Sequence, residues 1–345
     1  MFACSQSDWP EPLTKTARKE NALHKADDTK FSRLLVTGGA GFIGSEFVRS
    51  SLSGSLFGGK PSKITVVDAL TYAGDMRRLS TVSRNDGLVF VKADIKEELV
   101  MTSLIAEHDA IIHFAAESHV DRSIERSKDF IQSNIVGTHT ILEIAKNLSK
   151  VVVLVSTDEV YGSLDSGSAD ETFPLKPASP YSASKAAGDL LGMAYATTYG
   201  LDVRITRSAN NYGRYQDCEK LLPKLVTNLS KNVKIPIYGD GSNIRNWIHI
   251  QDHCEAIARV LHLGSAGEIY NIGSEESYRN IDLAKLLLDY FRLSEDMIEY
   301  VTDRKGHDFR YAINSDKATK LLNWKPKRKL LDSISEILAG IQFLS

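Results

Sequence analysis

The sequence is poor in cysteine and has no pair of cysteines at metal-binding spacing. Cys4, Cys218 and Cys254 are the three in 345 residues, too scattered for a CxxC pair or a disulfide framework. This usage favours a reducing compartment, and we expect a cytoplasmic protein. His249 and His253 have the spacing of two ligands on one helix, but isoleucine rather than glutamate follows the first histidine. We interpret the pair as a polar helix start and predict no metal site.

The chain also lacks a charge excess and a long apolar run. Its 42 Lys and Arg against 44 Asp and Glu give a formal net charge of -2, with no block of like charges. This balance argues against a nucleic-acid partner. No stretch approaches the roughly 20 apolar residues of a membrane span. We therefore expect no membrane partner, and we interpret residues 1–30 as a polar N-terminal extension with little order.

Short apolar runs alternate with longer amphipathic runs from residue 33 onward. Strands are predicted over residues 33–37, 64–68, 88–92, 110–114, 151–156 and 203–207. Helices are predicted over residues 42–51, 96–107, 129–148 and 181–199. Runs of Val, Ile and Leu indicate strands buried on both faces, hence a parallel sheet, and the alternation indicates right-handed βαβ units. The predicted fold class is α/β, a Rossmann-type doubly wound parallel sheet.

The alternation loosens after about residue 210, where Pro223, Pro236, Gly239 and Gly241 interrupt it. This change predicts a smaller, mixed C-terminal substrate lobe packed at the carboxyl edge of the sheet. We therefore expect the Rossmann domain mainly over residues 31–210 and the lobe mainly over residues 211–345, with the chain crossing back to the sheet.

A glycine-rich segment follows the first predicted strand. Gly38, Gly41 and Gly44 have a G-x-x-G-x-x-G spacing where a strand becomes a helix. The first glycine permits a tight turn, the second lets the backbone approach a pyrophosphate, and the third lets the helix pack close to the sheet. Helix N-terminal N–H groups then face the anion. The spacing alone also fits a simple tight turn, but the strand before it and the helix after it favour a dinucleotide site.

The acids that end the next two strands predict which dinucleotide binds. Asp68 can accept hydrogen bonds from the ribose hydroxyls and repel a 2′-phosphate, and Ala69 follows it rather than an arginine. NAD is therefore favoured over NADP. Asp94 and Ile95 follow the third strand, where Asp94 would accept from the adenine amino group; a helix N-cap is the alternative role for this acid.

Tyr181 and Lys185 are spaced i and i+4, which places them on one face of a helix. A neighbouring ammonium and the positive nicotinamide of bound NAD favour the phenolate, and we expect both to lower the tyrosine pKa from about 10. Such a tyrosine can act as a general base near neutral pH. The spacing is common by chance, so its weight comes from the glycine-rich segment upstream and from the strand that ends just before it.

Thr157, Asp158 and Glu159 stand at the carboxyl end of a predicted parallel strand, where ligands of open α/β sheets bind. Adjacent carboxylates in one pocket push each other's pKa values apart, so that one can donate a proton while the other accepts one. A solvated turn is the alternative interpretation of the two acids.

Together these motifs resemble the extended short-chain dehydrogenase/reductase superfamily, and within it the nucleotide-sugar 4,6-dehydratases that act on dTDP-glucose. The resemblance runs from about residue 33 to about residue 326. It rests on residues 37–44, 68–74, 115–123, 157–159, 181–185 and 210–213. It implies oxidation of a nucleotide-diphosphate hexose at C4 with NAD, loss of water across C5 and C6, and return of the hydride to C6. It also implies a homodimer.

The resemblance assigns a role to each matched residue. Tyr181 would take the proton of the 4-hydroxyl, with Thr157 bonded to the 4-oxygen and Lys185 close by. Glu159 would remove the C5 proton, and Asp158 would protonate the departing 6-hydroxyl. Further NAD contacts would come from Phe42, Ile43, Ala69, Leu70, Thr71, Phe114, Ala115, Ala116, Ser133 and Asn211. The nucleotide sugar would be bound by Ser118, Asn210, Glu219, Lys220, Leu221, Pro236, Ile237, Tyr238, Arg245, Asn280, Arg304 and His307.

Departures from the family pattern leave the base open. Arg214, Asp217, Cys218 and Lys305 all border the expected nucleotide end. Thymidine is favoured and uridine stays possible, because one methyl group in an apolar pocket discriminates only weakly. Two other activities share the glycine loop, an NAD-dependent 4-epimerase and a decarboxylase, but the adjacent carboxylates argue against both. A non-catalytic NAD-binding regulator could dispense with the tyrosine and lysine, which are intact.

Overall fold

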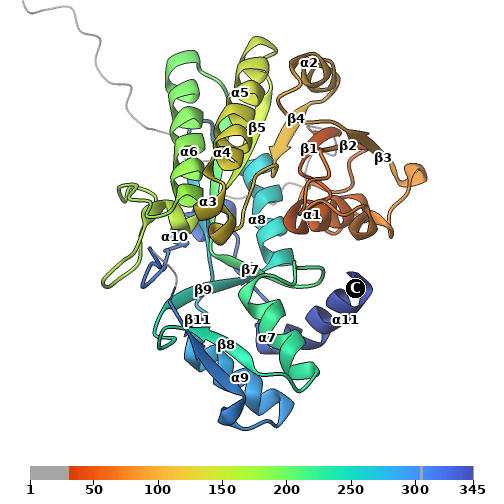
Figure 1. Ribbon diagram of the computed structural model, residues 1–345. Helices are drawn as coiled ribbons and strands as arrows, with labels where there is room; N and C mark the ends of the chain where they lie inside the picture. Colours follow the sequence, from red (N-terminus) through yellow and green to blue (C-terminus); the bar gives the residue numbers. More distant parts are fainter. Residues whose placement is uncertain (1–30, 304–305, 345) are drawn as a thin grey trace, which may run out of the picture.

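The structure is a computed structural model that describes residues 31–303 and 306–344. The predicted extension over residues 1–30 lies outside the described residues. A seven-stranded sheet forms the larger part of the molecule (Figure 1). Its strands are β1 (Arg33–Thr37), β2 (Lys63–Asp68), β3 (Leu88–Lys92), β4 (Ala110–His113), β5 (Val151–Thr157), β6 (Val203–Ser208) and β10 (Ile269–Ile272).

The strands pair in the order β10-β6-β5-β4-β1-β2-β3, and every pair is parallel. The predicted α/β class and parallel sheet are therefore confirmed. The direction in which the chain adds strands reverses between β1 and β4. From β1 the chain continues to β2 and β3 on one side, and from β4 it continues to β5 and β6 on the other. Ligands of such sheets bind outside the carboxyl ends of the strands at this switch point.

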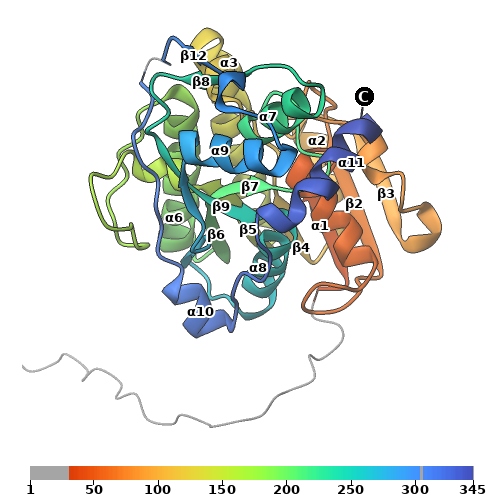
Figure 2. The same ribbon diagram turned by 90° about the horizontal axis from the view of Figure 1, so that it is seen from below.

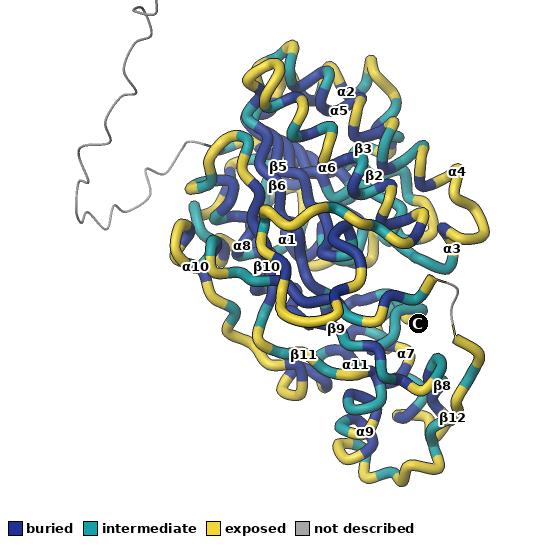
Figure 3. The backbone as a smooth tube through the Cα atoms, turned by 90° about the vertical axis from the view of Figure 1, so that its left-hand side faces the viewer, coloured by how far each residue is buried: buried dark blue, intermediate teal, exposed yellow. Residues whose placement is uncertain are grey.

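Helices cover both faces of the sheet because successive strand residues point to opposite sides. Leu35 belongs to the core beneath α2 (Glu98–Glu107), α5 (Thr138–Asn147) and α6 (Pro180–Tyr199), and Val36 to the core beneath α1 (Phe42–Leu52) and α8 (Ile250–Leu263). Figure 3 shows the buried strands β5 and β6 between these layers. None of the helices in the described ranges has the length and apolar character that crossing a bilayer needs.

The predicted helix over residues 129–148 is confirmed as an unbroken helix over residues 127–147, but its middle is π-helical, which was not predicted. The structure has α3 (Val120–Glu125), α4 (Ser127–Phe130), a π-helical turn over Ile131–Gly137 and then α5. Within the turn, Asn134 accepts from the backbone N–H of Glu117 at 2.8 Å and donates to its carbonyl at 3.0 Å. This pairing with another segment favours the wider turn, a distortion that is frequent at functional sites.

The smaller lobe is mixed, as predicted (Figure 2). One sheet has β7 (Asn210–Tyr212), β9 (Ile244–His249) and β11 (Ser277–Arg279), and a second pairs β8 (Ile235–Tyr238) with β12 (Ile298–Val301). Its helices are α7 (Leu221–Ser230), α9 (Asn280–Phe291) and α11 (Ile334–Leu344); α10 (Asp316–Leu322) packs near α8. The lobe has its own apolar core. The chain leaves it through α8 and β10 to rejoin the large sheet, and the division at residue 210 stays a prediction.

Candidate active site

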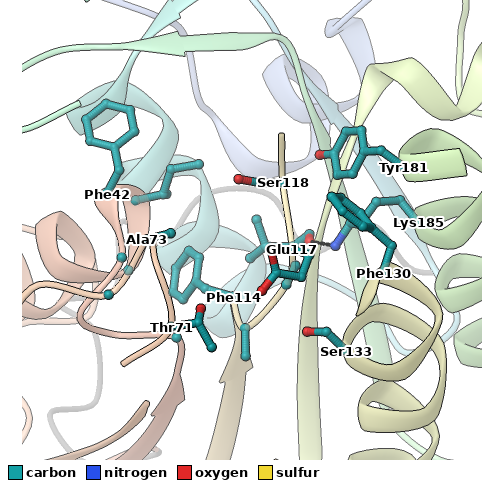
Figure 4. Close-up of a pocket in the computed structure, with 18 of the residues that line it drawn as sticks. Phe42, Thr71, Ala73, Phe114, Glu117, Ser118, Phe130, Ser133, Tyr181 and Lys185 are labelled. Carbon is teal, nitrogen blue, oxygen red and sulfur yellow. Dashed lines mark hydrogen bonds between the residues drawn. The ribbon is translucent and has the colours of Figure 1, made fainter. Parts of the chain in front are cut away.

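A cavity of about 1040 Å³ lies at the carboxyl ends of the parallel strands. Its walls come from the segments after β1, β2, β3 and β4, from the end of β5, from α6 and from the lobe segment that follows β7. Figure 4 shows Tyr181 and Lys185 across the cavity from Phe42 and Ala73. The switch point of the sheet is therefore hollow, and both parts of the molecule contribute to it.

The glycine-rich turn occupies one wall and leaves no room for side chains. Gly38 has a φ of +69°, and a Cβ there would stand 2.6 Å from the backbone nitrogen of Ala115. A Cβ on Gly44 would stand 2.4 Å from the carbonyl oxygen of Gly38. The N-cap residue Gly41 gives no side-chain hydrogen bond to α1. A helix N-terminus without a side-chain cap, at the cavity wall, fits a bound pyrophosphate.

Asp68 supports this turn as well as facing the cavity. Its carboxylate accepts from the backbone N–H of Ala40 at 3.0 Å and of Leu70 at 2.8 Å. Leu70 has a φ of +53° and is not on the cavity wall, so its predicted contact with the cofactor stays a prediction. Asp94 lies on the wall and also accepts from the N–H of Lys96 at 3.0 Å, so it caps the turn before α2.

The structure brings most of the predicted cofactor residues to this one cavity. Those on its wall are Gly38, Gly41, Phe42, Ile43, Gly44, Asp68, Ala69, Thr71, Asp94, Ile95, Phe114, Ala115, Ala116, Ser133, Tyr181, Lys185 and Asn211. Residues that the sequence argument missed also lie there, among them Tyr72, Glu117 and Gln216. Burial and the nearby Asp129 raise the pKa of the Glu117 carboxyl.

Helix α6 places the tyrosine and the lysine on the cavity wall. Ser179 caps this helix by accepting from the N–H of Ser182 at 3.1 Å, and a proline at the first position fixes its start. Tyr181 is therefore in the first turn and Lys185 one turn later on the same face. The Lys185 ammonium donates to the carbonyl of Val155 at 2.8 Å, and burial lowers its pKa.

The expected lowering of the Tyr181 pKa does not come from the protein's own groups. Burial and the Glu159 carboxylate raise this pKa, and the hydrogen bond with Thr157 offsets only part of the rise. That expectation is therefore wrong for the chain by itself. A positive charge close to the phenol is needed to reverse the effect, and an oxidised nicotinamide ring has one.

The two adjacent acids have different surroundings. Thr157 ends β5 and accepts from the N–H of Glu159 at 3.3 Å, which starts a short 3-10 helix over Asp158–Tyr161. Asp158 is only 2% exposed, whereas Glu159 is partly exposed and lies on the cavity wall. Burial, followed by the charge of Glu159, raises the pKa of Asp158 to about 8. The raised pKa favours the protonated form of Asp158, which a proton donor needs, and Asp158 lies behind the cavity wall that Thr157 and Glu159 help to form.

This carboxyl should make stability depend on pH. Its pKa is about 8 in the fold against an ordinary 3.8, so its stabilising contribution is complete below about pH 3.8 and is lost as the pH rises through about 8. Asparagine carries no charge at any pH. We expect Asp158→Asn to raise Tm relative to the unmodified protein by about 2–5 °C more at about pH 8.5 than at about pH 5. Calorimetric scans at the two pH values measure this; a constant difference would contradict the raised pKa.

A buried charge network behind the cavity was not predicted. Asp189, one turn after Lys185 on α6, pairs with Arg207 of β6 at 2.9 Å, and both side chains are 3% exposed. Arg207 also donates to the Tyr161 hydroxyl at 2.9 Å. The carboxylate of Asp189 opposes the lowering of the Lys185 pKa. The i and i+4 spacing of lysine and aspartate was visible in the sequence, but the arginine partner was not.

The predicted substrate residues divide into two groups. Ser118, Thr157, Asn210, Lys220 and Leu221 lie on the cavity wall. Those away from it, in the part of the chain that the structure describes, are Glu219, Pro236, Ile237, Tyr238, Arg245, Asn280 and His307. Arg304 and the departure at Lys305 lie outside the described residues.

Arg245 has partners other than the expected phosphate. Its guanidinium donates to the backbone carbonyls of Ile244 at 2.8 Å and Asp308 at 2.9 Å, and it stacks on the Tyr311 ring at 4.4 Å. Its charge acts to lower the pKa of Asp158, so it lies close enough to affect that acid. Its grip on a diphosphate stays a prediction.

The two histidines at helical spacing have structural partners. His249 is the N-cap of α8 and accepts from the N–H of Gln251 at 3.2 Å, which agrees with a polar helix start. His253 is fully buried and bonds through Nδ1 to Asn211 at 2.8 Å, and burial lowers its pKa to about 3. Within the described residues, no group of three or more His, Cys, Asp or Glu is arranged to hold a metal ion.

Comparisons with known proteins agree with this geometry. The sequence model of the family described as GDP-mannose 4,6 dehydratase matches residues 35–337. A dTDP-glucose 4,6-dehydratase of Streptomyces niveus is 46% identical over 305 residues, which are 88% of this chain and 91% of that protein. The crystal structure of DesIV, a dTDP-glucose 4,6-dehydratase of Streptomyces venezuelae with NAD and TYD bound, is 48% identical with a TM-score of 0.86, covering 90% of this chain and 96% of that one. A UDP-glucose 4-epimerase of Thermotoga maritima has a TM-score of 0.81 at 26% identity, covering 90% and 98%.

Proposed function

The chain belongs to the nucleotide-sugar 4,6-dehydratase family, and from this premise we propose that it converts dTDP-glucose to its 4-keto-6-deoxy sugar. The observation that carries the proposal is the environment of Asp158, a buried acid with a pKa of about 8 beside a carboxylate on the cavity wall. A 4-epimerase or a decarboxylase has no use for this pair. The higher identity to dehydratases than to the 4-epimerase supports the same assignment.

The cavity fits NAD. The lack of side chains at Gly38 and Gly44 lets a pyrophosphate come close to the backbone. Asp68 at the end of β2 suits unmodified ribose hydroxyls better than a 2′-phosphate. When bound, NAD supplies the hydride acceptor for the sugar C4 and the hydride donor for C6. The protein has to hold the sugar, move the protons and exclude water.

Tyr181 takes the proton of the sugar 4-hydroxyl in this proposal. Thr157 is hydrogen-bonded to the phenol and can share the 4-oxygen with it. The Lys185 ammonium is fixed by its hydrogen bond to the carbonyl of Val155, and both Lys185 and Tyr181 lie on the cavity wall. A proton leaves the sugar most readily when these donors stabilise the oxygen that loses it.

The two acids then remove water. A ketone at C4 acidifies the C5 proton, which Glu159 accepts from its place on the cavity wall. Asp158, protonated in the resting state, gives its proton to the departing 6-hydroxyl. One acid gains a proton as the other loses one, so the pair keeps a single negative charge throughout. This constancy matters because burial makes a second charge costly.

Assays with different substrates test which nucleotide base and which sugar the protein accepts. Incubation with dTDP-glucose followed by alkali should produce the ultraviolet absorption of a 4-keto-6-deoxy sugar. Parallel incubations with UDP-glucose and GDP-mannose measure discrimination by the nucleotide end, and dTDP-glucose should give the highest kcat/KM. No absorption with any of the three would remove the dehydratase assignment.

We also propose that the chain is a cytoplasmic homodimer. Exposed apolar side chains on α6 and on the π-helical turn support a second copy as the partner, among them Leu190, Tyr199 and Ile131, which are 59%, 56% and 47% exposed. Sedimentation velocity tests this, and a monomer at all concentrations would contradict it. The location rests on the scarcity of cysteine alone.

A further inference from the structure

The segment over residues 214–220, here called the strap, joins β7 of the lobe to α7 and runs along the cavity. Gln216, Asp217 and Lys220 are on the cavity wall. The Lys220 ammonium donates to the carbonyl of Ser118, on the opposite domain, at 2.8 Å. The strap is therefore both a wall of the cavity and a connection between the two parts of the molecule.

One buried cation ties the strap to the cofactor half of the cavity. Arg78, in the short 3-10 helix after β2, is 3% exposed. Its guanidinium donates to the carbonyls of Ala40 at 3.2 Å, in the glycine-rich turn, and of Ala73, in the segment after β2. It also donates to the carbonyl of Tyr215 at 3.2 Å and pairs with the carboxylate of Asp217, both in the strap.

The side of the strap away from the cavity is equally constrained. Tyr215 has a φ of +69°, an uncommon backbone conformation for a bulky residue. Its ring lies under the Arg49 guanidinium at 4.9 Å and against the Phe343 ring at 5.2 Å. A Cβ on Gly340 would stand 2.4 Å from the Tyr215 nitrogen, so α11 approaches the strap backbone closely. Strained backbone persists where the surroundings fix it.

We propose that Arg78 is a positioning residue that latches the strap onto the two loops of the NAD site and so retains the cofactor throughout the catalytic cycle. The inference rests on the proposed NAD site. Retention is required because the reaction re-oxidises the same cofactor molecule that it first reduced, and a cofactor lost in mid-cycle would leave the sugar as a ketone.

Arginine suits this position because its planar fork offers five N–H donors in fixed directions. Here the donors reach three segments that are far apart in the sequence. Ala40 is held from both sides, since its N–H donates to Asp68 at 3.0 Å and its carbonyl accepts from Arg78 at 3.2 Å. Lifting the strap separates a buried guanidinium from its only carboxylate partner among the described ion pairs, which is strongly unfavourable.

The test follows cofactor release rather than turnover. The purified protein is loaded with NADH and mixed with excess NAD, and the change in fluorescence as bound NADH becomes free NADH gives the dissociation rate. Asp217→Asn should raise the rate constant of NADH dissociation by about tenfold or more. Asp217→Glu, which keeps the carboxylate, should restore slow release. Arg78→Met should be at least as fast as Asp217→Asn, and the double variant no faster than Arg78→Met, because the two groups act as one latch.

A matched control lies one residue away. Arg77 pairs with Asp75 at 2.8 Å on the surface, and its side chain is 54% exposed. Arg77→Met therefore removes an arginine and an ion pair without touching the strap, and its NADH release should stay within about twofold of the unmodified protein. Should Arg78→Met fail to fold, Asp217→Asn carries the test alone, since that side chain is 23% exposed.

Two results would overturn the latch: release from Asp217→Asn as slow as from the unmodified protein, or equal acceleration in Arg77→Met. A fall in Tm that accompanies unchanged release points to a purely structural pair and also overturns it. The outcome is separate from the proposed activity. If NADH release is slow and Asp217→Asn accelerates it, the latch is supported even if dTDP-glucose is not dehydrated. If dTDP-glucose is dehydrated but Asp217→Asn leaves release unchanged, the activity is supported and the latch is not.

Discussion

Glu159→Gln is expected to lower kcat for dehydration of dTDP-glucose by about 10²–10⁴-fold while the sugar is still oxidised at C4. Glutamine has nearly the shape of glutamate but cannot accept the C5 proton. The phenol of Tyr181 and the Lys185 ammonium are unchanged, so the first proton transfer remains possible. Removing the negative charge also removes one cause of the raised Tyr181 pKa, which favours that first step.

The measurement separates the two steps on the sugar itself. Turnover in D₂O should leave no deuterium at C5, and quenching with borodeuteride should trap a 4-ketone that still carries its 6-hydroxyl. Glu143→Gln is a suitable control because Glu143 bonds to Lys146 and Tyr195, none of which lies on the cavity wall. Deuterium entering C5 at the unmodified rate in Glu159→Gln would transfer the role of base to another group.

Local signals carried most of the prediction. The first and third strands lie where the pattern placed them, at Arg33–Thr37 and Leu88–Lys92, because a buried parallel strand needs an unbroken apolar run. The glycine spacing located the turn because a Cβ at Gly38 or Gly44 would overlap backbone atoms. Each of these constraints acts between residues that are close in the sequence or on a single strand.

Contacts between distant segments were not predictable. Arg78 and Asp217 are 139 residues apart, and nothing in either local sequence shows that a guanidinium from one loop reaches a carboxylate in another. The same holds for Arg245, to which the resemblance assigned a phosphate but which donates to the carbonyl of Asp308, 63 residues away, as well as to that of its neighbour Ile244. The π-helical turn at Ile131–Gly137 pairs with Glu117 outside the helix, so helical periodicity alone did not predict it.

The pKa of Tyr181 shows why a charge argument from sequence spacing was incomplete. Lys185 one turn away suggested an acidic phenol, but Glu159 and the burial of the ring act in the opposite direction. The spacing predicted the helix face but not the neighbours of the phenol at the end of β5 and in the 3-10 helix after it. The phenol is therefore held neutral until a positive charge arrives, which links its basicity to cofactor binding.

Tyr181→Phe is expected to lower kcat by about 10³–10⁴-fold and, unlike Glu159→Gln, to block the reaction before the sugar is oxidised. The ring and its packing against Phe130 at 6.2 Å are retained, so the loss falls on the hydroxyl. No 4-ketone should be trapped by borodeuteride, and no deuterium should enter C5, because the C5 proton is not acidic without the ketone.

Tyr195→Phe provides the control, since Tyr195 is on the same helix with its hydroxyl bonded to Glu143 at 2.7 Å and away from the cavity wall. It should keep turnover within about twofold. If Tyr181→Phe still yields a trapped 4-ketone at the unmodified rate, the first proton must go to Thr157 or to a water held by Lys185. Because the two variants block at different steps, the 4-ketone trapped by borodeuteride distinguishes them: it should form with Glu159→Gln and not with Tyr181→Phe, whereas C5 exchange should be absent from both.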